Sequence, residues 1–112
     1  MDPENAPNPE MALQGAPSKS VKVLLAHQPG AIKKASQLGF DLQLSGHTHG
    51  GQFKPFNLAV ERSTPYIAGL YKHNDTWIYV NRGTGYWGPP LRLGIPSEIT
   101  VLTLTGKVVE TQ

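Results

Sequence analysis

A nearly continuous apolar run at residues 21–26 constrains the fold of this chain more than any other feature. A run of this length, partly β-branched, is typical of a strand that is buried on both faces of a sheet. Pro29 then opens a short amphipathic helical pattern that ends at Gly39. The apolar face of that pattern consists of Ile32, Ala35 and Leu38. A helix of this kind is expected to cover a sheet.

A second strand is expected directly after this helix. Residues 41–45 alternate, with Leu42 and Leu44 on one side, and they lead into a glycine-flanked His-Thr-His tripeptide that contains His47 and His49. Strand, helix and strand in so few residues predict a compact βαβ unit, whose strands run parallel with a right-handed crossover. The sequence therefore predicts the α/β fold class.

Two antiparallel β-hairpins are predicted in the second half of the chain. Residues 66–72 and 76–81 flank His73-Asn74-Asp75, and residues 99–104 and 107–110 flank Thr105-Gly106. Between the hairpins lie residues 82–96, where glycine and proline are too frequent for regular structure.

The first 20 residues differ from the rest because they are rich in proline. The sequence Asn8-Pro9-Glu10 is a helix-start signal, and Gly15 is expected to end the turn that follows. We interpret residues 1–20 as a flexible linker with a possible short helix, and residues 21–112 as one domain.

Both predicted strands of the βαβ unit are followed by histidines. His27 comes just after the first strand, and His47 and His49 come just after the second. Parallel strands end at the same edge of a sheet, where open α/β sheets usually bind ligands, so the three imidazoles are expected to converge. In an extended tripeptide, His47 and His49 lie on the same side, close enough for one metal ion or two adjacent ions.

Each of these histidines alone has a simpler interpretation, as a loop residue that only forms hydrogen bonds. Together, on adjacent strand ends and bracketed by glycine, they favour metal binding. Neutral imidazole suits Zn, Mn, Fe, Ni and Co, so the histidines leave the identity of the metal open. His73, in a polar hairpin turn, is expected to have no such role.

No carboxylate lies near the three histidines in the sequence. None of the acidic residues is within about five positions of them: Asp2, Glu4, Glu10, Asp41, Glu61, Asp75, Glu98 and Glu110. Two neighbouring divalent cations repel each other, and two-metal hydrolases generally bridge them with carboxylates. A complete two-metal site is therefore not expected in this chain alone.

The composition excludes several other kinds of site. The formal net charge of +2 comes from scattered basic residues, so no clear nucleic-acid binding is expected. The absence of cysteine excludes disulfides, thiolate metal sites and a thiol nucleophile. No apolar run approaches the roughly 20 residues of a membrane span, and nothing in the sequence indicates a compartment.

Two motifs resemble the C-terminal part of the calcineurin-like metallophosphoesterase superfamily, where a ligand histidine after a strand precedes a Gly-His-x-His motif. The matching segments are Leu24-Leu25-Ala26-His27-Gln28-Pro29 and Leu44-Ser45-Gly46-His47-Thr48-His49-Gly50-Gly51. The closer resemblance is to a bacterial subgroup of predicted phosphohydrolases, often membrane-associated. That subgroup has segments similar to residues 79–90, 92–94 and 96–100, so the resemblance covers nearly the whole chain.

The resemblance implies that His27 and His47 bind one divalent metal ion and that His49 binds a second. It also implies an αββα sandwich, with this chain as its C-terminal half, and hydrolysis of phosphate esters by a water that two metals activate. The family's Asp-x-His, Gly-Asp and Gly-Asn-His-Asp/Glu motifs are missing. We therefore expect the N-terminal half of the same enzyme as a partner, a truncation before Met1, and no activity from this chain alone.

Two other functions remain open at this point. One is a non-enzymatic α/β module in which the histidines hold a structural or regulatory metal, and the other is a metal-free interaction domain. Arg82 follows a predicted strand, and it either contacts the substrate phosphate or is simply solvated. Tyr86 and Trp87 are expected to be packing residues.

Overall fold

The computed structural model describes residues 7–52, 54–55, 57–64, 66–86, 88 and 90–106. Within these ranges four strands form one sheet, in the order β1-β2-β4-β3. The strands are β1 Val23–Leu25, β2 Leu42–Ser45, β3 Gly69–His73 and β4 Thr76–Val80. The helices are α1 Pro9–Ala12, α2 Ile32–Gln37 and α3 Asn57–Ser63, with 3-10 turns η2 Pro29–Ala31 and η3 His49–Gly51. The predicted α/β class is confirmed.

The parallel strand pair predicted from the sequence is present. β1 pairs in parallel with β2, with Val23 opposite Leu42, and η2 and α2 connect the two strands. Pro29 is the first residue of η2, where its missing N–H costs no helical hydrogen bond. Gly39, at a φ of 80°, supplies the left-handed conformation that commonly follows a helix. β4 then lies on the other side of β2, also in parallel.

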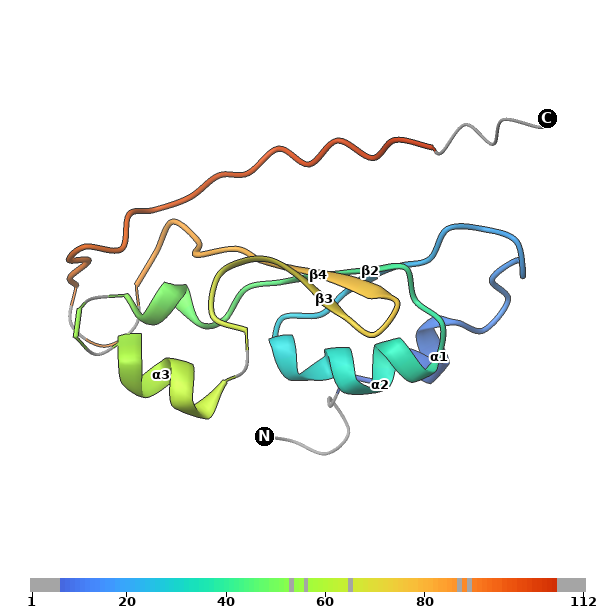
Figure 1. The fold of residues 1–112 in the computed structure, drawn as a ribbon, viewed down its shortest axis with the longest axis horizontal. Coiled ribbons are helices and arrows are strands. Elements are labelled where there is room, and N and C mark those ends of the chain that lie inside the picture. The colour runs from blue at the N-terminus through green and yellow to red at the C-terminus, as the bar shows by residue number, and fades with distance from the viewer. Residues whose placement is uncertain are drawn as a thin grey trace.

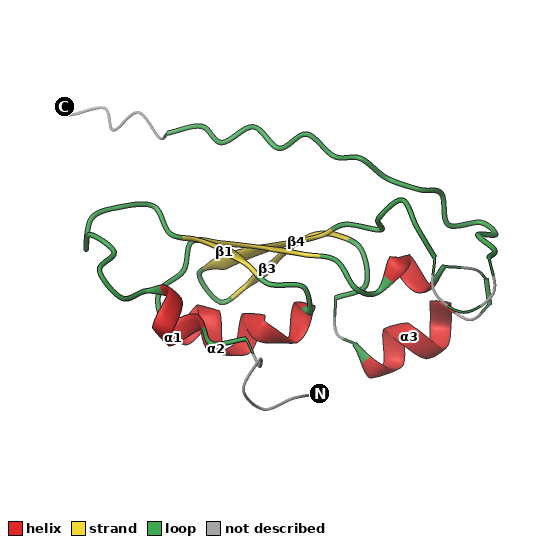
Figure 2. Cartoon of the chain, turned by 180° about the vertical axis from the view of Figure 1, so that it is seen from behind, coloured by secondary structure: helices red, strands yellow, loops and turns green. Residues whose placement is uncertain are grey.

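The core lies between the sheet and the helices α1 and α2, which cover one of its faces (Figure 2). Ile32 and Ala35 of α2 have no exposed surface. Ile32 packs with Ile78 and Val80 of β4, while Ala35 belongs to a second cluster that contains Leu24 of β1. Burial of each large aliphatic side chain contributes about 1.5–3 kcal/mol. This packing holds the parallel strands, and therefore their carboxyl ends, in register.

The opposite face of the sheet differs from the prediction. Residues 21–26 were expected to be buried on both faces, but Val23 is 39% and Leu25 is 77% exposed. β1 is an edge strand of the sheet. Among the described residues, the C-terminal segment passes over the sheet face opposite α1 and α2 (Figure 1). Between that segment and the sheet is a cavity of about 510 Å³, lined by residues that include Leu70, Trp77 and Leu102. One apolar sheet face is therefore only loosely covered.

The first predicted hairpin is confirmed and the second is not. β3 and β4 are antiparallel, and Asn74 adopts a φ of 54° in the turn between them. Residues 99–104 were expected to form a strand, but no strand within the described residues includes them. Their alternating apolar pattern lacks a strand partner here, and Ile99 and Val101 are each 89% exposed. Residues 107–110 lie outside the described residues.

Two further segments bear on the candidate site. α3 was not predicted from the sequence. None of its residues is buried, so it has no apolar face packed against the core. The described residues between positions 82 and 96 are irregular, as predicted, and Leu93 joins them to the segment after the His-Thr-His tripeptide. The Leu93 N–H donates to the Gln52 carbonyl at 3.2 Å, and the Lys54 N–H donates to the Leu93 carbonyl at 3.1 Å.

Candidate metal centre

The ends of β1 and β2 bring two of the predicted histidines together. His27 lies two residues after β1, and His47 lies two residues after β2. The Gly46 N–H donates to the His27 carbonyl at 3.0 Å, so the two chains stay paired beyond the strands. His27 and His47 therefore lie together at the carboxyl edge of these strands.

The imidazoles of His27 and His47 face each other at the surface. Nε2 of His27 lies 3.2 Å from Nδ1 of His47, and the ring planes are inclined by 76°. When two nitrogens bind the same ion at ~2.1 Å, they are separated by roughly 3.0–3.4 Å if the angle between them at the ion is between a right angle and a tetrahedral angle. The separation of this histidine pair fits two ligands of one divalent ion.

His49 does not join this pair. The extended tripeptide assumed from the sequence is wrong, because His47 and His49 have φ values of 71° and 50° and Thr48 has a right-handed helical conformation. His49 is therefore turned into η3, where its Nδ1 lies 3.4 Å from Nη2 of Arg92. The three histidines lie at one edge of the sheet, but only two of them are in contact.

His49 is partly buried, and its surroundings favour the neutral imidazole. Burial lowers its pKa below the usual 6.5, and the guanidinium of Arg92 lowers the pKa further. His47 and His27 also lower this pKa, while a hydrogen bond to the backbone of Gly85 opposes the shift. Neutral imidazole is the form that binds metal ions. The surroundings of His49 therefore favour the form in which imidazole can bind a metal ion.

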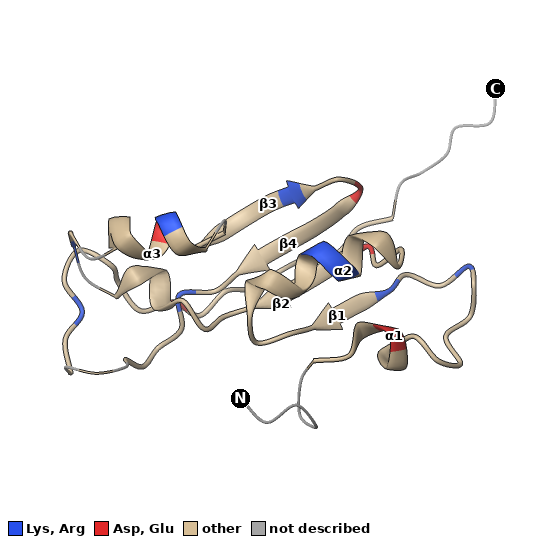
Figure 3. Ribbon diagram, turned by 90° about the horizontal axis from the view of Figure 1, so that it is seen from below, with Lys and Arg blue, Asp and Glu red and all other residues tan. Residues whose placement is uncertain are grey.

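Among the described residues, the set of possible metal ligands around these histidines is incomplete. In the part of the chain that the structure describes, no group of three or more His, Cys, Asp or Glu side chains is placed to hold a metal ion. Lys, Arg, Asp and Glu are spread over several elements (Figure 3). Within the described residues, the histidine pair could therefore supply two ligands of a metal ion but does not form a complete site.

Arg82, predicted as a possible phosphate ligand, forms an ion pair with Glu98. Its Nη1 lies 3.7 Å from Oε2 of Glu98, and its side chain remains 40% exposed. Tyr86, predicted to pack, is instead 59% exposed, because it lies on the irregular loop away from both core clusters. Trp87 lies outside the described residues.

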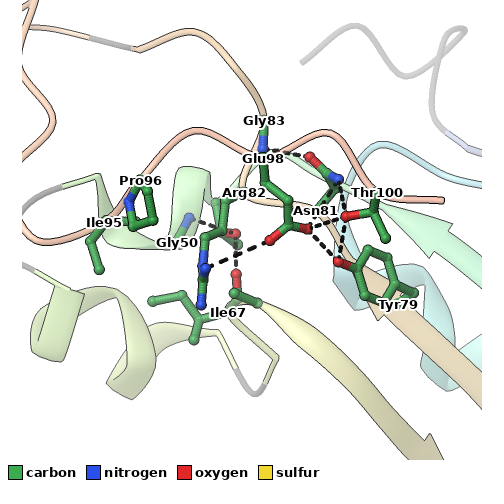
Figure 4. A network of polar contacts seen from close by, with 12 residues as sticks. Gly50, Ile67, Tyr79, Asn81, Arg82, Gly83, Ile95, Pro96, Glu98 and Thr100 are labelled. Atoms are coloured by element: carbon green, nitrogen blue, oxygen red, sulfur yellow. Dashed lines mark hydrogen bonds and ion pairs between the residues drawn. The ribbon is translucent and has the colours of Figure 1, made fainter.

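A polar network around Glu98, which the sequence did not reveal, joins residues 97–100 to the end of β4 (Figure 4). Oε1 of Glu98 accepts hydrogen bonds from the Tyr79 hydroxyl, from the Thr100 hydroxyl at 2.7 Å and from the Asn81 amide at 3.1 Å. The Glu98 N–H donates to the Gly83 carbonyl at 2.9 Å. The network closes the loop that contains Arg82 and Arg92.

Removal of the Glu98 charge is expected to make stability less dependent on pH. Burial alone would raise the pKa of Glu98, but hydrogen bonds from Tyr79 and Thr100 and the charge of Arg82 hold it below 4.5. As the pH falls, Glu98 therefore takes up a proton in the unfolded chain before it does so in the folded chain. The stabilisation of the fold by the charged Glu98 side chain is present above pH 4.5 and is lost as the pH falls through the lowered pKa.

The test is chemical unfolding of the Glu98→Gln variant at several pH values. At pH 7 it is expected to be about 1–2 kcal/mol less stable than the unmodified chain, since hydrogen bonds to a charged acceptor are stronger. The difference should shrink as the pH falls below 4.5. Glu61→Gln on the exposed α3 controls for loss of a surface charge, with an expected change under ~0.5 kcal/mol. A difference that is constant with pH would contradict the prediction.

An α/β sheet with a histidine pair at the carboxyl edge of its parallel strands defines a candidate site for a divalent metal. Comparison with known proteins is consistent with this class. An uncharacterized metallophosphoesterase of Helicobacter pylori is 49% identical over 104 residues, which cover 91% of this chain and 28% of that protein. The chain belongs to the metallophosphoesterase family.

Two further relatives extend this finding beyond one organism. A bovine protein named transmembrane protein with metallophosphoesterase domain is 48% identical over 98 residues, covering 85% of this chain and 22% of that protein. The uncharacterized metallophosphoesterase YkuE of Bacillus subtilis is 41% identical over 102 residues, covering 88% of this chain and 36% of that protein. No family model and no solved structure matches the chain significantly.

These relatives correct one expectation and show how much of a longer protein the chain matches. The restriction to a bacterial subgroup is not supported, because the relatives include animal proteins. The chain spans between about a fifth and a third of the length of these relatives. Although the bovine relative is named a transmembrane protein, the described residues contain no helix long and apolar enough to cross a bilayer.

Proposed function

We propose that this chain supplies one wall of the two-metal site of a phosphoesterase, and that the N-terminal half of the same enzyme supplies the rest. The observation that carries the proposal is the 3.2 Å separation of His27 Nε2 and His47 Nδ1, in a chain whose relatives are named metallophosphoesterases. The incomplete donor set is consistent with a second half that contributes carboxylates.

The histidines act in this proposal as ligands and not as proton donors. His27 and His47 would hold one divalent ion through the facing ring nitrogens, and His49 would hold a second ion. Two divalent ions supply a nucleophilic water at neutral pH and stabilise charge on the phosphate ester. Arg82, which is partly exposed beside Glu98, is proposed to contact the phosphate of the substrate.

The loosely covered sheet face supports the same division into halves. Val23, Leu25 and Trp77 expose apolar surface there, and surface of this kind is commonly covered in a complete protein. We propose that the N-terminal half packs over this face and completes the sandwich. Its carboxylates would then lie at the same edge as the histidine pair.

Hydrolysis of a chromogenic phosphodiester tests the proposed function. The protein that joins this chain to its N-terminal half is expected to hydrolyse bis(p-nitrophenyl) phosphate with Mn²⁺, to lose activity with a chelator and to regain it with added metal. The 112-residue chain alone is expected to be inactive. Chelator-insensitive hydrolysis by the longer protein, or full activity of this chain alone, would refute the proposal, and metal binding without hydrolysis would favour a non-enzymatic metal module.

A further inference from the structure

A cavity of about 390 Å³ lies between the His-Thr-His tripeptide and α3. Its described lining consists of His47, Thr48 and His49 on one side and of Val60, Ser63 and Thr64 on the other. α3 and η3 are in contact and lie side by side (Figure 2). Two of the three proposed metal ligands therefore form one wall of a cavity whose opposite wall is α3 and the residue after it.

Contacts at two places connect α3 to the tripeptide. Gly51 packs closely against the start of the helix, because a Cβ built at Gly51 would lie 2.3 Å from Cα of Asn57. Beyond the end of the helix, the hydroxyl of the buried Thr48 donates to the Ile67 carbonyl at 2.6 Å. The chain is thus tied to the tripeptide both before and after the α3 residues that line the cavity.

The α3 side of the cavity combines hydroxyl groups with an apolar side chain, and none of its described lining residues is charged. The Ser63 hydroxyl donates to the Val60 carbonyl at 3.0 Å, and while it does so its oxygen is left to accept. Such an acceptor binds the O–H group of a ligand, whereas an anionic ligand needs donors. An uncharged alcohol with several hydroxyl groups has both O–H donors and C–H surface, so it fits this wall better than a second phosphate does.

We propose that this cavity binds an uncharged polyol that is esterified to the phosphate of the substrate. The inference rests on the proposed function, in which the phosphate lies at metal ions held by the histidines. Because His47 and His49 line the cavity, a group bonded to that phosphate can extend from the metal site toward α3. Val60 packs against the carbon skeleton of the polyol, and Ser63 accepts a hydrogen bond from one of its hydroxyl groups. Small-molecule pockets commonly measure about 300–1,000 Å³, so this cavity has room for a single sugar ring.

Three chromogenic phosphodiesters test the proposal in the protein that joins this chain to its N-terminal half. Each contains one p-nitrophenyl group, and the second ester group is methyl, cyclohexylmethyl, or glucose linked through its primary hydroxyl. Water forms the new bond to phosphorus and p-nitrophenolate leaves in every case, so one absorbance signal reports all three reactions. With Mn²⁺, kcat/KM is expected to be about 3–10-fold higher for the glucose diester than for the cyclohexylmethyl diester, the usual effect of one added hydrogen bond.

Val60→Trp fills the cavity and tests whether the larger ester groups occupy it. It is expected to lower kcat/KM for the glucose and cyclohexylmethyl diesters by at least ~10-fold and to change that for the methyl diester by less than about threefold, because only the larger groups need the space. Retained hydrolysis of the methyl diester also shows that the variant is folded. The matched control is Leu58→Trp on the same helix, since Leu58 is 55% exposed and is not among the described lining residues.

Ser63→Ala tests the recognition of hydroxyl groups. The variant is expected to lose about 3–10-fold in kcat/KM for the glucose diester and to leave the cyclohexylmethyl diester unchanged, because only glucose can donate to the Ser63 oxygen. Ser36→Ala on α2 is the matched control. The Ser36 hydroxyl makes the same kind of bond, to the Lys33 carbonyl at 3.1 Å, but it is not among the residues that line the cavity.

The outcomes separate this proposal from the proposed function. Equal kcat/KM for the glucose and cyclohexylmethyl diesters would overturn the polyol site, and so would equal effects of Val60→Trp on all three diesters. In either case, metal-dependent hydrolysis of the methyl diester would leave the proposed function standing. If the longer protein hydrolyses none of the three diesters, the proposed function and the polyol site are both refuted.

Discussion

Replacement of His47 with alanine, in the protein that joins this chain to its proposed N-terminal half, is expected to lower phosphodiester hydrolysis by more than ~100-fold. Loss of groups that merely orient a metal ligand costs 10–100-fold, and loss of a ligand itself should cost more. His47 is one of only two imidazoles in contact at the strand ends, so its removal leaves His27 as the sole partner from this pair. The measurements are kcat/KM with Mn²⁺ and the metal content of the purified protein.

The fourth histidine provides the control for this experiment. His73 is at the end of β3, where its Nδ1 lies 2.7 Å from the Tyr66 hydroxyl and away from the histidine pair. His73→Ala is expected to retain activity within about threefold and to bind the same amount of metal, because a partly exposed neutral hydrogen bond contributes only ~1 kcal/mol to folding. Wild-type activity and metal content in His47→Ala would exclude His47 as a ligand.

A second large effect is expected at Gly51, where alanine should lower the free energy of unfolding by about 2–5 kcal/mol. Gly51 has a φ of 78°, and an added Cβ would lie 2.3 Å from Cα of Asn57. Left-handed backbone costs an alanine roughly 1–2 kcal/mol, and overpacking typically costs about 1–3 kcal/mol more. Since Asn57 is the first residue of α3, relief of the clash requires that helix to move away from η3.

Urea unfolding of Gly51→Ala and Gly30→Ala measures this effect against a matched control. Gly30 lacks a positive φ, and a Cβ built there would meet no atom within 4 Å. Gly30→Ala is therefore expected to change stability by less than ~1 kcal/mol. Equal stabilities of the two variants would mean that α3 does not pack against Gly51 as described.

The local sequence pattern was sufficient to predict the two strands and the helix that bring His27 and His47 together. The apolar run before His27, the helical face of Ile32 and Ala35, and the alternation before His47 each depend on neighbours within one element. The topology of a short βαβ unit then requires parallel strands, and parallel strands end at one edge. The contact between His27 and His47 follows from these steps.

Other predictions failed because the local sequence pattern does not show which other parts of the protein pack against a segment. Residues 99–104 alternate like a strand, but a strand also needs a neighbour with free backbone groups, and none pairs with them in the described chain. Residues 21–26 are apolar on both sides, but the periodicity does not show which face this chain itself covers. α3 lacks a buried face, so no periodic signal marked it.

The sequence by itself determined the α/β class, the parallel strand pair and the position of His27 and His47 at its carboxyl edge, because short-range periodicity and chain connectivity decide these features. Only the tertiary structure decided the place of His49. The left-handed φ values of His47 and His49 turn its ring away from the pair, and Arg92, 43 residues further along the chain, meets it there. Local periodicity does not predict this contact, because the two residues are far apart in the sequence and Arg92 lies outside any helix or strand.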